Sequence, residues 1–209
     1  MANLSDEELL VTHGARLLHL GKGELIFSQG EPATQFYIVK SGKVKMAHFN
    51  EQGREFIQGY FSAGQSFGEP PLIAKLNYPA SAFASEESEV WKIPYAKFIE
   101  LLKEHFEIHL GLLETLSERL IYKSMMLSEV AIEDAEHRLQ SLLGYLKKER
   151  GIPAEKEYPV PFTRQQLADM IGLRVETVIR TIKSMEQKGI LEIIEGKIFW
   201  LPKKRSQPP

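Results

Sequence analysis

Hydrophobic and polar residues alternate in short segments between about residues 16 and 91. The segments ELIFSQG, QFYIVKSG, KVKMAHFNEQG and EFIQGYFSAG are separated by glycine turns roughly every ten to twelve residues, a spacing typical of antiparallel sandwiches and barrels. KSGK (40–43) and NEQGRE (50–55) are predicted hairpin turns, because glycine adopts the positive φ that tight connections need. The first part of the chain is therefore predicted to be an all-β domain.

The pattern becomes helical after Pro94. Residues 95–130 lack proline, and apolar residues recur there at alternating spacings of three and four, which predicts one long helix over about residues 95–131. The seam consists of Phe106, His109, Leu113, Leu116, Leu120, Lys123, Leu127 and Val130. Such a helix could pack on its own domain, but it is longer than one small β domain can cover. We therefore favour self-pairing across a two-fold axis.

The predicted dimer contacts within this seam are Phe106, His109, Leu113, Leu116, Leu120 and Leu127. Gly111 and Lys123 interrupt the seam locally. A further helix begins within IEDAEHRL, where Asp134 suits the N-cap and the Glu136 carboxylate complements the helix dipole. We expect a hinge at residues 131–134. Residues 149–162 hold three prolines and a glycine, and they are predicted to form a loop.

The C-terminal part has the pattern of two short helices followed by a hairpin. Thr163 and Gln166 form a T-x-x-Q capping box, so a helix begins there and ends at Gly172. The apolar residues that this helix is expected to bury are Leu167, Ala168 and Ile171. The next helix follows immediately, and so short a turn makes the two helices cross steeply, as in a helix-turn-helix. Residues 189–201 (GILEIIEGKIFWL) are predicted to form a β-hairpin wing that turns at Glu195-Gly196.

The second helix, within GLRVETVIR (172–180) and beyond, has two chemically different faces. Val178, Ile182 and Met185 lie on one face, which we expect to be core. Glu176 and Arg180 lie on the other, with Val175 and Ile179 alongside. A face that mixes charge with aliphatic groups suits the major groove, which offers hydrogen-bonding edges and thymine methyl groups. The alternative is an ordinary surface pair, worth about 0.2–0.5 kcal/mol.

The amino-acid composition excludes several kinds of site and reaction. The 209 residues contain no cysteine, which excludes disulfides, thiolate zinc sites, cysteine nucleophiles and thiolate-held iron–sulfur clusters. The 43% hydrophobic content is enough for one or two packed domains. The start, MANLSDEELL, is acidic where a signal peptide would be basic, and no apolar run approaches the roughly 18 residues that span a bilayer. We therefore expect a cytoplasmic protein with no membrane partner.

Charge is distributed unevenly along the chain. The net charge is −2, yet residues 162–209 carry nine Lys or Arg and five Asp or Glu, a balance of +4. Residues 1–161 therefore carry −6. Affinity for phosphate backbones is largely a local counterion-release effect, so a basic end on an acidic body favours double-stranded DNA as a partner of that end.

These motifs together resemble the Crp/Fnr family of bacterial transcription regulators over about residues 20–201. The resemblance rests on SQGEPATQFYIVKSGKVKM, FGE at 67–69, the long helix, EDAEHR, and TRQQLADMIGLRVETVIRTIKSMEQKGIL. It implies an α+β chain with an N-terminal double-stranded β-roll like a cyclic-nucleotide-binding domain, a long dimerisation helix and a C-terminal winged helix-turn-helix. The implied domains are residues 1–132, for effector sensing and dimerisation, and 133–209, for DNA binding.

The same resemblance implies an activator that acts as a homodimer on a two-fold-symmetric operator, with RNA polymerase as a further partner. It assigns base contacts to Glu176 and Arg180, and Val175 implies a half-site of the TTGA kind. We expect Ile179 to contact a thymine methyl group and Arg174, which replaces the usual Ser or Thr N-cap, to contact a phosphate or a base. Contacts to the DNA backbone are expected from Thr163, Arg164, Gln165 and Lys183.

The sensor segment GEPPLIAKLNYPASA (68–82) departs from the cyclic-nucleotide pattern of the family. Gly68 and Glu69 match, but the arginine position falls on Pro79 or Ala80. A buried cyclic phosphate without a cation is costly, and Lys75, the nearest substitute, cannot form a bidentate clamp. We therefore expect an unknown small-molecule effector other than cAMP or cGMP, or none. The expected effector-pocket residues are Phe67, Gly68, Glu69, Tyr78 and Ser81.

Two alternatives to this sensor remain. The ending NYPASA is similar to that of nitric-oxide-responsive and haem-binding relatives, so haem is the alternative cofactor, with His13, His19, His48, His105 and His109 as candidate axial ligands. A cyclic-nucleotide-binding module that controls a partner protein is the other, but it needs the missing arginine. We do not expect an enzyme or a metal site, because His48 is the only histidine within the roll proper and no H-x-H pair or nearby set of His and Glu with metal-ligand spacing accompanies it.

Overall fold

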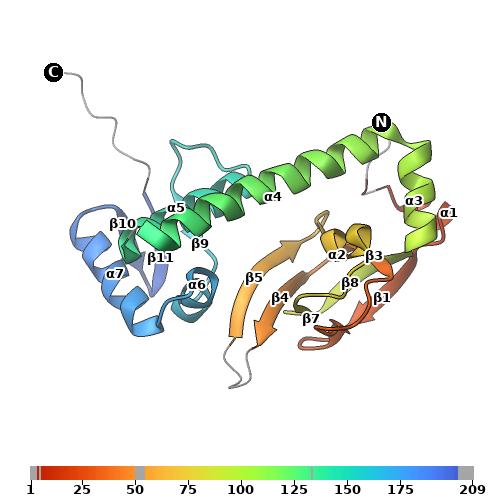
Figure 1. The fold of residues 1–209 in the computed structure, drawn as a ribbon. Helices are drawn as coiled ribbons and strands as arrows, with labels where there is room; N and C mark the ends of the chain where they lie inside the picture. Colours follow the sequence, from red (N-terminus) through yellow and green to blue (C-terminus); the bar gives the residue numbers. More distant parts are fainter. Residues whose placement is uncertain (1–3, 5, 50–54, 133, 202–209) are drawn as a thin grey trace. The chain divides into compact units, whose positions relative to one another are not determined.

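The computed structural model describes residues 4, 6–49, 55–132 and 134–201 (Figure 1). The chain forms two compact units, Met1–Ser117 and Glu118–Pro209, which divide inside one helix. The domain boundary expected at residues 132 and 133 stays a prediction. Within the described residues, no helix is both long and apolar enough to cross a membrane.

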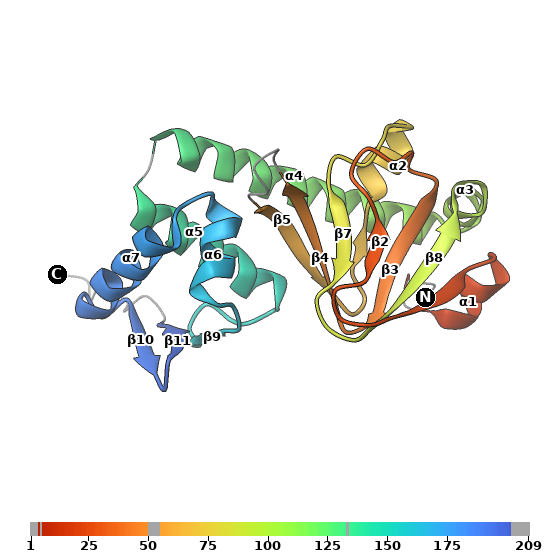
Figure 2. The same cartoon turned by 90° about the horizontal axis from the view of Figure 1, so that it is seen from below.

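The first unit contains two four-stranded sheets, and every strand pair in them is antiparallel (Figure 2). One sheet has the order β1 (Arg16–Leu20), β8 (Ser88–Pro94), β3 (Gln35–Ser41) and β6 (Ser66–Phe67). The other has the order β2 (Leu25–Phe27), β7 (Ser81–Ala84), β4 (Lys43–Phe49) and β5 (Glu55–Ser62). The predicted antiparallel β-roll is therefore confirmed.

The segment KSGK joins the two sheets, so the predicted hairpin there is wrong. β3 pairs with β6 and β8, whereas β4 pairs with β5 and β7. Gly42 has the expected positive φ of 78°. A glycine is needed there because the chain passes close to residues 87 and 88, and not because of a hairpin. A Cβ at Gly42 would collide with the Glu87 carbonyl oxygen and the Ser88 Oγ. The second predicted hairpin does join paired strands, since Phe49 opposes Glu55, while residues 50–54 of its turn lie outside the described residues.

Strand β3 is buried on both faces because it separates two apolar clusters. Tyr37 and Val39 face the interior of the roll, where Phe27, Phe67 and Tyr78 also pack. Phe36 and Ile38 face the opposite side, as the two-residue period of a strand requires. That second cluster is completed by helices: α1 (Glu7–Thr12) contributes Leu10, α3 (Tyr95–Glu104) contributes Phe98 and Leu101, and α4 (Phe106–Ile132) contributes Ile108 and Leu112. A further short helix, α2 (Glu69–Ala74), lies between β6 and β7.

The long helix predicted over residues 95–131 is two helices, α3 and α4, separated at His105. The His105 N–H donates to the Leu101 carbonyl at 3.0 Å, which ends α3. The His105 carbonyl accepts from the N–H groups of Ile108 and His109 at 3.1 and 3.2 Å, which starts α4. The change of direction allows both helices to bury apolar residues on the same cluster. It involves neither proline nor glycine, so the local sequence carries no sign of it.

The second unit contains the remaining elements around its own core. They are α5 (Ala135–Glu149), β9 (Tyr158–Val160), α6 (Arg164–Ile171), α7 (Val175–Gln187), β10 (Leu191–Ile194) and β11 (Lys197–Trp200). Asp134 caps α5 as predicted, and its carboxylate accepts from the Glu136 and His137 N–H groups at 3.0 and 2.9 Å. Residue 133 of the expected hinge lies outside the described residues.

The predicted loop at residues 149–162 contains a strand, β9, which pairs with β11 in a sheet of order β10-β11-β9. Pro159 lies in the middle of β9 and is exposed, while Tyr158 and Val160 on either side are buried. Proline is tolerated on an edge strand because its missing N–H faces away from the ladder. The prolines of this segment therefore disguise a strand that has an ordinary alternating pattern.

We predict that Gly42→Ala destabilises the first unit more than Gly23→Ala does. Both glycines have positive φ, 78° and 87°, so each substitution carries a backbone cost of about 1–2 kcal/mol. Only at Gly42 does the added methyl group also meet neighbouring atoms, since a Cβ at Gly23 finds nothing within 4 Å. Urea unfolding followed by Trp91 fluorescence in a Trp200→Phe background measures the difference. Equal losses of stability would show that the crossing at Gly42 is not tight.

Candidate nucleic-acid interface

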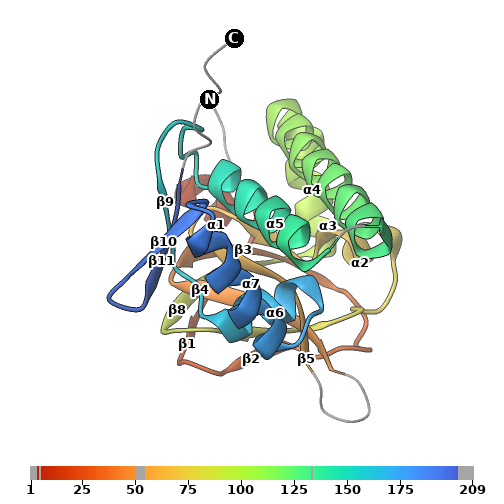
Figure 3. The same ribbon diagram turned by 90° about the vertical axis from the view of Figure 1, so that its left-hand side faces the viewer.

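Helices α6 and α7 are joined by residues 172–174 and lie next to each other in the second unit (Figure 3). The predicted capping box is present: Thr163 Oγ1 accepts from the Gln166 N–H at 3.2 Å, and Gln166 Oε1 accepts from the Thr163 N–H at 2.9 Å. Gly172 ends α6 with a φ of 68°, as predicted. The two helices form the expected helix-turn-helix because both ends of α6 are fixed by local sequence.

The orientation of α7 about its axis is set by its buried face. The side chains of Val178, Ile182 and Met185 are at most 2% exposed, and α7 contacts α5, α6 and β10. The predicted core face is therefore confirmed. The opposite face is exposed and carries Glu176, Ile179, Arg180 and Lys183. An aliphatic side chain between two charged ones is thus presented to solvent, with Ile179 39% exposed.

The Glu176 carboxylate and the Arg180 guanidinium are not bonded to each other. Within residues 134–201 neither group has a hydrogen bond or an ion pair in the structure, although they are four residues apart on one helix face. Nearby, by contrast, Lys188 Nζ lies 2.7 Å from Glu136 Oε2. The interpretation of Glu176 and Arg180 as a surface ion pair is therefore not supported, and both groups are available to an external partner.

The first turn of α7 carries a misfit that the sequence predicted. Arg174 occupies the N-cap with extended dihedrals, φ −76° and ψ 144°, and it makes no side-chain capping hydrogen bond. The first N–H groups of a helix are unsatisfied without a cap and attract anions. The exposed Arg174 places a positive charge beside them. This combination of charge and unpaired amides suits a phosphate group.

The predicted backbone contacts have different environments. Arg164 Nη1 donates to the Gly196 carbonyl, which ties α6 to the turn of the hairpin. Gln165 Nε2 donates to Asp169 Oδ1 at 2.8 Å, and Thr163 uses its hydroxyl in the capping box. Lys183 is exposed. The structure thus gives Arg164 and Thr163 a structural task, and their contact with a nucleic acid stays a prediction.

The hairpin next to α7 is the predicted wing. β10 and β11 pair with Ile194 opposite Lys197, so the turn contains only Glu195 and Gly196. Both turn residues have positive φ, 49° and 79°. Two consecutive positive φ values define the type I′ turn that matches the twist of a two-residue hairpin.

The predicted effector-pocket residues are packed into the interior of the roll. The Tyr78 ring stacks on Phe27 with centroids 3.7 Å apart, and Phe67 is fully buried. Tyr78 donates its hydroxyl to the Gln35 carbonyl at 3.2 Å, and burial raises the pKa of this phenol. The predicted role of Phe67, Gly68, Glu69, Tyr78 and Ser81 in binding an effector stays a prediction.

The polar groups of this region have partners within the roll. Glu69 is 1% exposed, and its carboxylate accepts a short hydrogen bond from the Ser66 hydroxyl. Ser81 Oγ accepts from the Gln29 N–H at 2.9 Å. Of the two residues at which the arginine of the cyclic-nucleotide pattern could fall, Pro79 is exposed and Ala80 is fully buried. An effector at this place would have to exchange these internal contacts for its own.

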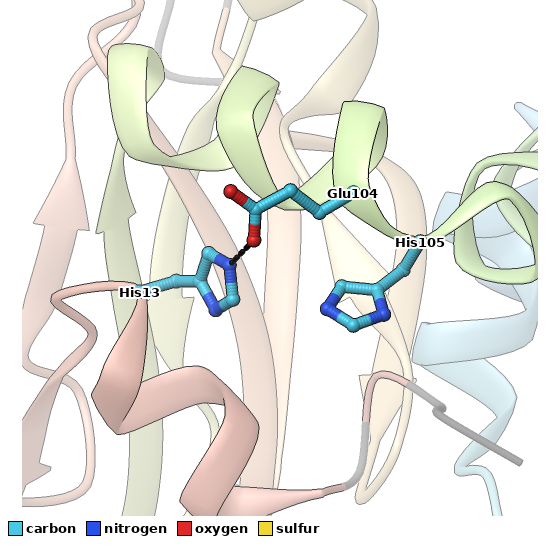
Figure 4. Close-up of side chains that lie close together, drawn as sticks. All are labelled: His13, Glu104 and His105. Carbon is cyan, nitrogen blue, oxygen red and sulfur yellow. Dashed lines mark hydrogen bonds and ion pairs between the residues drawn. The ribbon is translucent and has the colours of Figure 1, made fainter.

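The histidines considered as haem ligands are spread over the first unit, except for one pair that lies close together. His19 Nδ1 lies 3.1 Å from Glu89 Oε1 at the surface, and the His109 ring contacts Phe106. His13 and His105, in contrast, are brought together, with ring centroids 5.7 Å apart (Figure 4). Glu104 lies beside both. The group could not be recognised from the sequence, because His13 lies 91 positions before Glu104.

A β-roll followed by a winged helix-turn-helix defines a two-part DNA-binding regulator. Comparison with known families agrees: the cyclic nucleotide-binding domain matches residues 17–105, and the Crp-like helix-turn-helix domain matches residues 137–203. The chain belongs to the Crp/Fnr family of transcription regulators. The relatives are transcription regulators and not enzymes.

Individual relatives cover most of the chain. The cAMP-activated global transcriptional regulator Vfr of Pseudomonas aeruginosa is 31% identical over 90% of this chain and 89% of its own length. Electron transport regulator A of Shewanella oneidensis is 30% identical over 84% of this chain and 70% of its own length. The c-di-GMP responsive global regulator CLP of Xanthomonas campestris has a similar fold, with a TM-score of 0.73, 24% identity and coverage of 93% of this chain and 97% of its own.

We predict that Arg174→Ser stabilises the protein but weakens its binding to DNA. A serine N-cap should add about 1 kcal/mol to the free energy of unfolding. The loss of one phosphate contact should reduce the slope of log affinity against log salt by about one. Thermal denaturation and fluorescence anisotropy over a salt series measure the two effects. Lys22→Ser, which removes the same charge from the first unit, is the control. An unchanged salt slope in Arg174→Ser would rule out the phosphate contact.

Proposed function

We propose that this chain acts as a homodimer that binds a palindromic operator with TTGA-type half-sites and responds to a signal other than cAMP through its β-roll. The observation that carries the proposal is the exposed face of α7, where Glu176 and Arg180 lie beside Ile179 and have no partner among the residues that the structure describes. The edge of a base pair offers a hydrogen-bond donor to the carboxylate, acceptors to the guanidinium and a methyl group to the isoleucine.

The chemistry of this face matches direct readout in the major groove. A guanidinium donates two hydrogen bonds to guanine O6 and N7, and a carboxylate accepts from cytosine N4. Ile179 offers an apolar surface to a thymine methyl group. Arg174 and Lys183 flank these residues on α7 and add positive charge for phosphates. Charged and aliphatic side chains side by side are unusual on a solvated surface, but each kind has a partner in the major groove of DNA.

The exposed apolar residues of α4 support a dimer. Phe106, Leu113, Leu120 and Leu127 follow one another at intervals of seven, and they are 68%, 50%, 71% and 72% exposed. A line of large apolar residues with heptad spacing is typical of helices that pair. Leu116, another predicted contact, packs partly against the core of its own unit. The proposed interface is therefore centred on the four residues that recur every seven positions.

A dimer of this kind would place its two α7 helices on successive major grooves. Half-sites would then be separated by about one helical turn of DNA, roughly 34–36 Å. RNA polymerase is the expected further partner of an activator bound in this way. These elements of the proposal follow from the family and from two-fold symmetry.

The signal is proposed to be other than cAMP because residues 68–82 contain no arginine that could clamp a cyclic phosphate. The arginine position of the pattern falls on Pro79 or on buried Ala80, and Glu69 is engaged by Ser66. A phosphate placed there would be an uncompensated charge. Relatives such as Vfr are cAMP-activated, and the lack of arginine at residues 79 and 80 is the reason that we do not propose the same signal for this chain.

We predict that Glu176→Ala and Arg180→Ala each reduce discrimination between a duplex with inverted TTGA half-sites and a scrambled duplex. Each good base contact contributes about 1–3 kcal/mol of discrimination, which corresponds to roughly 5- to 150-fold. Competition binding at fixed salt measures the ratio. Gln187→Ala, an exposed substitution at the end of the same helix, is the matched control and should change nothing. Wild-type discrimination in both charged-residue variants would contradict the proposal.

We predict that Leu120→Glu converts the dimer to a monomer. A carboxylate in the middle of an apolar seam would have to be buried without a partner. Light scattering coupled to gel filtration should show twice the chain mass of 23.8 kDa for the wild type and the single mass for the variant. Leu76→Glu changes another leucine that is 62% exposed and should leave the dimer intact. A wild-type monomer, or a dimeric Leu120→Glu variant, would contradict the proposed interface.

A further inference from the structure

His13, Glu104 and His105 come together at one point of the first unit (Figure 4). Each offers one ligand atom, and these three atoms all lie within 4.8 Å of one another. His13 Nε2 and Glu104 Oε2 are 3.0 Å apart. Two ligands of a tetrahedral metal ion with bonds of about 2.0–2.1 Å are separated by about 3.3 Å. Without an ion, the His13–Glu104 distance is that of a hydrogen bond, and an opening of about 0.3 Å gives the spacing of two ligands of one ion.

The third ligand needs only a side-chain adjustment. His105 is half-buried, Glu104 is exposed, and neither is confined on all sides. The three ligand atoms lie within 4.8 Å of one another, and we expect rotation about the side-chain bonds of Glu104 and His105 to bring them to ligand spacing around an ion. Figure 4 shows the three side chains directed into one space, His13 from the end of α1 and the other two from the end of α3.

The backbone beneath these residues is held by the core. His13 follows α1, whose Leu10 is fully buried among Phe98 and Leu101 of α3. The His13 N–H bonds to the carbonyls of Leu9 and Leu10. His105 is fixed on both sides, because it ends α3 and starts α4. The backbone at His13 and His105 is therefore fixed before any ion binds, and only side chains have to move.

One ring nitrogen of His13 is hydrogen-bonded to the backbone, as is usual for a histidine that binds a metal ion through the other nitrogen. Its Nδ1 lies 2.9 Å from the Leu9 carbonyl, which accepts the Nδ1 proton and leaves Nε2 to face Glu104. In metal sites the ring nitrogen that does not bind the ion almost always donates to a carbonyl or carboxylate, and this bond fixes the tautomer and the direction of the ring. His13 is 7% exposed, so this orientation is also held by packing.

We propose that His13, Glu104 and His105 form a binding site for a divalent transition-metal ion, of which Zn²⁺ fits the ligands best. Two imidazole nitrogens and one carboxylate oxygen are the donor set of open zinc sites, which leave a fourth position for water or another ligand. The hard ions Mg²⁺ and Ca²⁺ prefer all-oxygen sites and do not suit two histidines. Nothing in the proposed DNA contact depends on this site.

A bound ion would connect α1 to the junction of α3 and α4. His105 is the residue at which the chain changes direction between these helices, and α4 carries the exposed heptad residues. The ion would therefore hold the start of α4 against the first unit. We expect this to raise the temperature at which the first unit unfolds, because an ion that binds only the folded state stabilises it.

The site is tested with the full-length protein, purified without a histidine tag and stripped of metal with EDTA. Equilibrium dialysis against ZnCl₂ should give one Zn²⁺ per chain, and Co²⁺ should give the visible d–d bands of four-coordinate nitrogen and oxygen ligation. His105→Ala and Glu104→Gln should each weaken Zn²⁺ binding at least about tenfold. Both residues are only partly buried, so these variants should fold. CD spectra and thermal denaturation without metal verify this.

The matched control is His19→Ala. His19 also lies beside a carboxylate, with 3.1 Å between His19 Nδ1 and Glu89 Oε1, but it does not belong to the three-ligand group. Its removal should leave Zn²⁺ affinity unchanged. The proposal is overturned if the wild type binds no Zn²⁺, if His105→Ala and Glu104→Gln bind it as tightly as the wild type, or if His19→Ala weakens binding as much as they do.

Discussion

The burial of one face of α7 is the constraint on which the proposed DNA contact depends. Val178, Ile182 and Met185 are removed from water, and each such side chain contributes about 1.5–3 kcal/mol. Rotating the helix by one residue would expose part of this face and force Glu176 or Arg180 toward the core, at a cost of several kcal/mol for an unpaired charge. The core of the second unit thus determines which side chains of α7 lie at the surface.

Helix α4 is subject to a related constraint, but it has apolar residues in more than one direction. Ile108 and Leu112 pack on the first unit, whereas Phe106, Leu113, Leu120 and Leu127 are exposed. A helix that is apolar around much of its circumference is stable when something covers it. A second copy of the same helix meets this need and at the same time supplies the two-fold symmetry that a palindromic site requires.

The sequence predicted the features that are determined by neighbouring residues. The capping box at Thr163, the N-cap at Asp134, the end of α6 at Gly172 and the hairpin turn at Glu195-Gly196 all depend on chemistry within a few positions, and all were found. The sequence also predicted that Arg174, at the N-cap of α7, would make no side-chain capping hydrogen bond, and this was found.

The features that the sequence did not predict depend on residues far apart in the chain. Gly42 connects two sheets because of contacts with residues 87 and 88, and His105 separates two helices because both pack on the same cluster. His13 meets Glu104 across 91 positions, so no spacing rule could associate them. The prolines around Pro159 led to the prediction of a loop, whereas this segment is a strand that pairs with β11.

The central claim is that a symmetric pair of α7 helices distinguishes one DNA sequence from others. The most direct measurement is selection of bound duplexes from a fully randomised library by the purified full-length protein, followed by sequencing. The account predicts enrichment of two inverted TTGA-type half-sites about one helical turn apart. Enrichment of a single, unrepeated half-site, or no enrichment over the starting library, would contradict it.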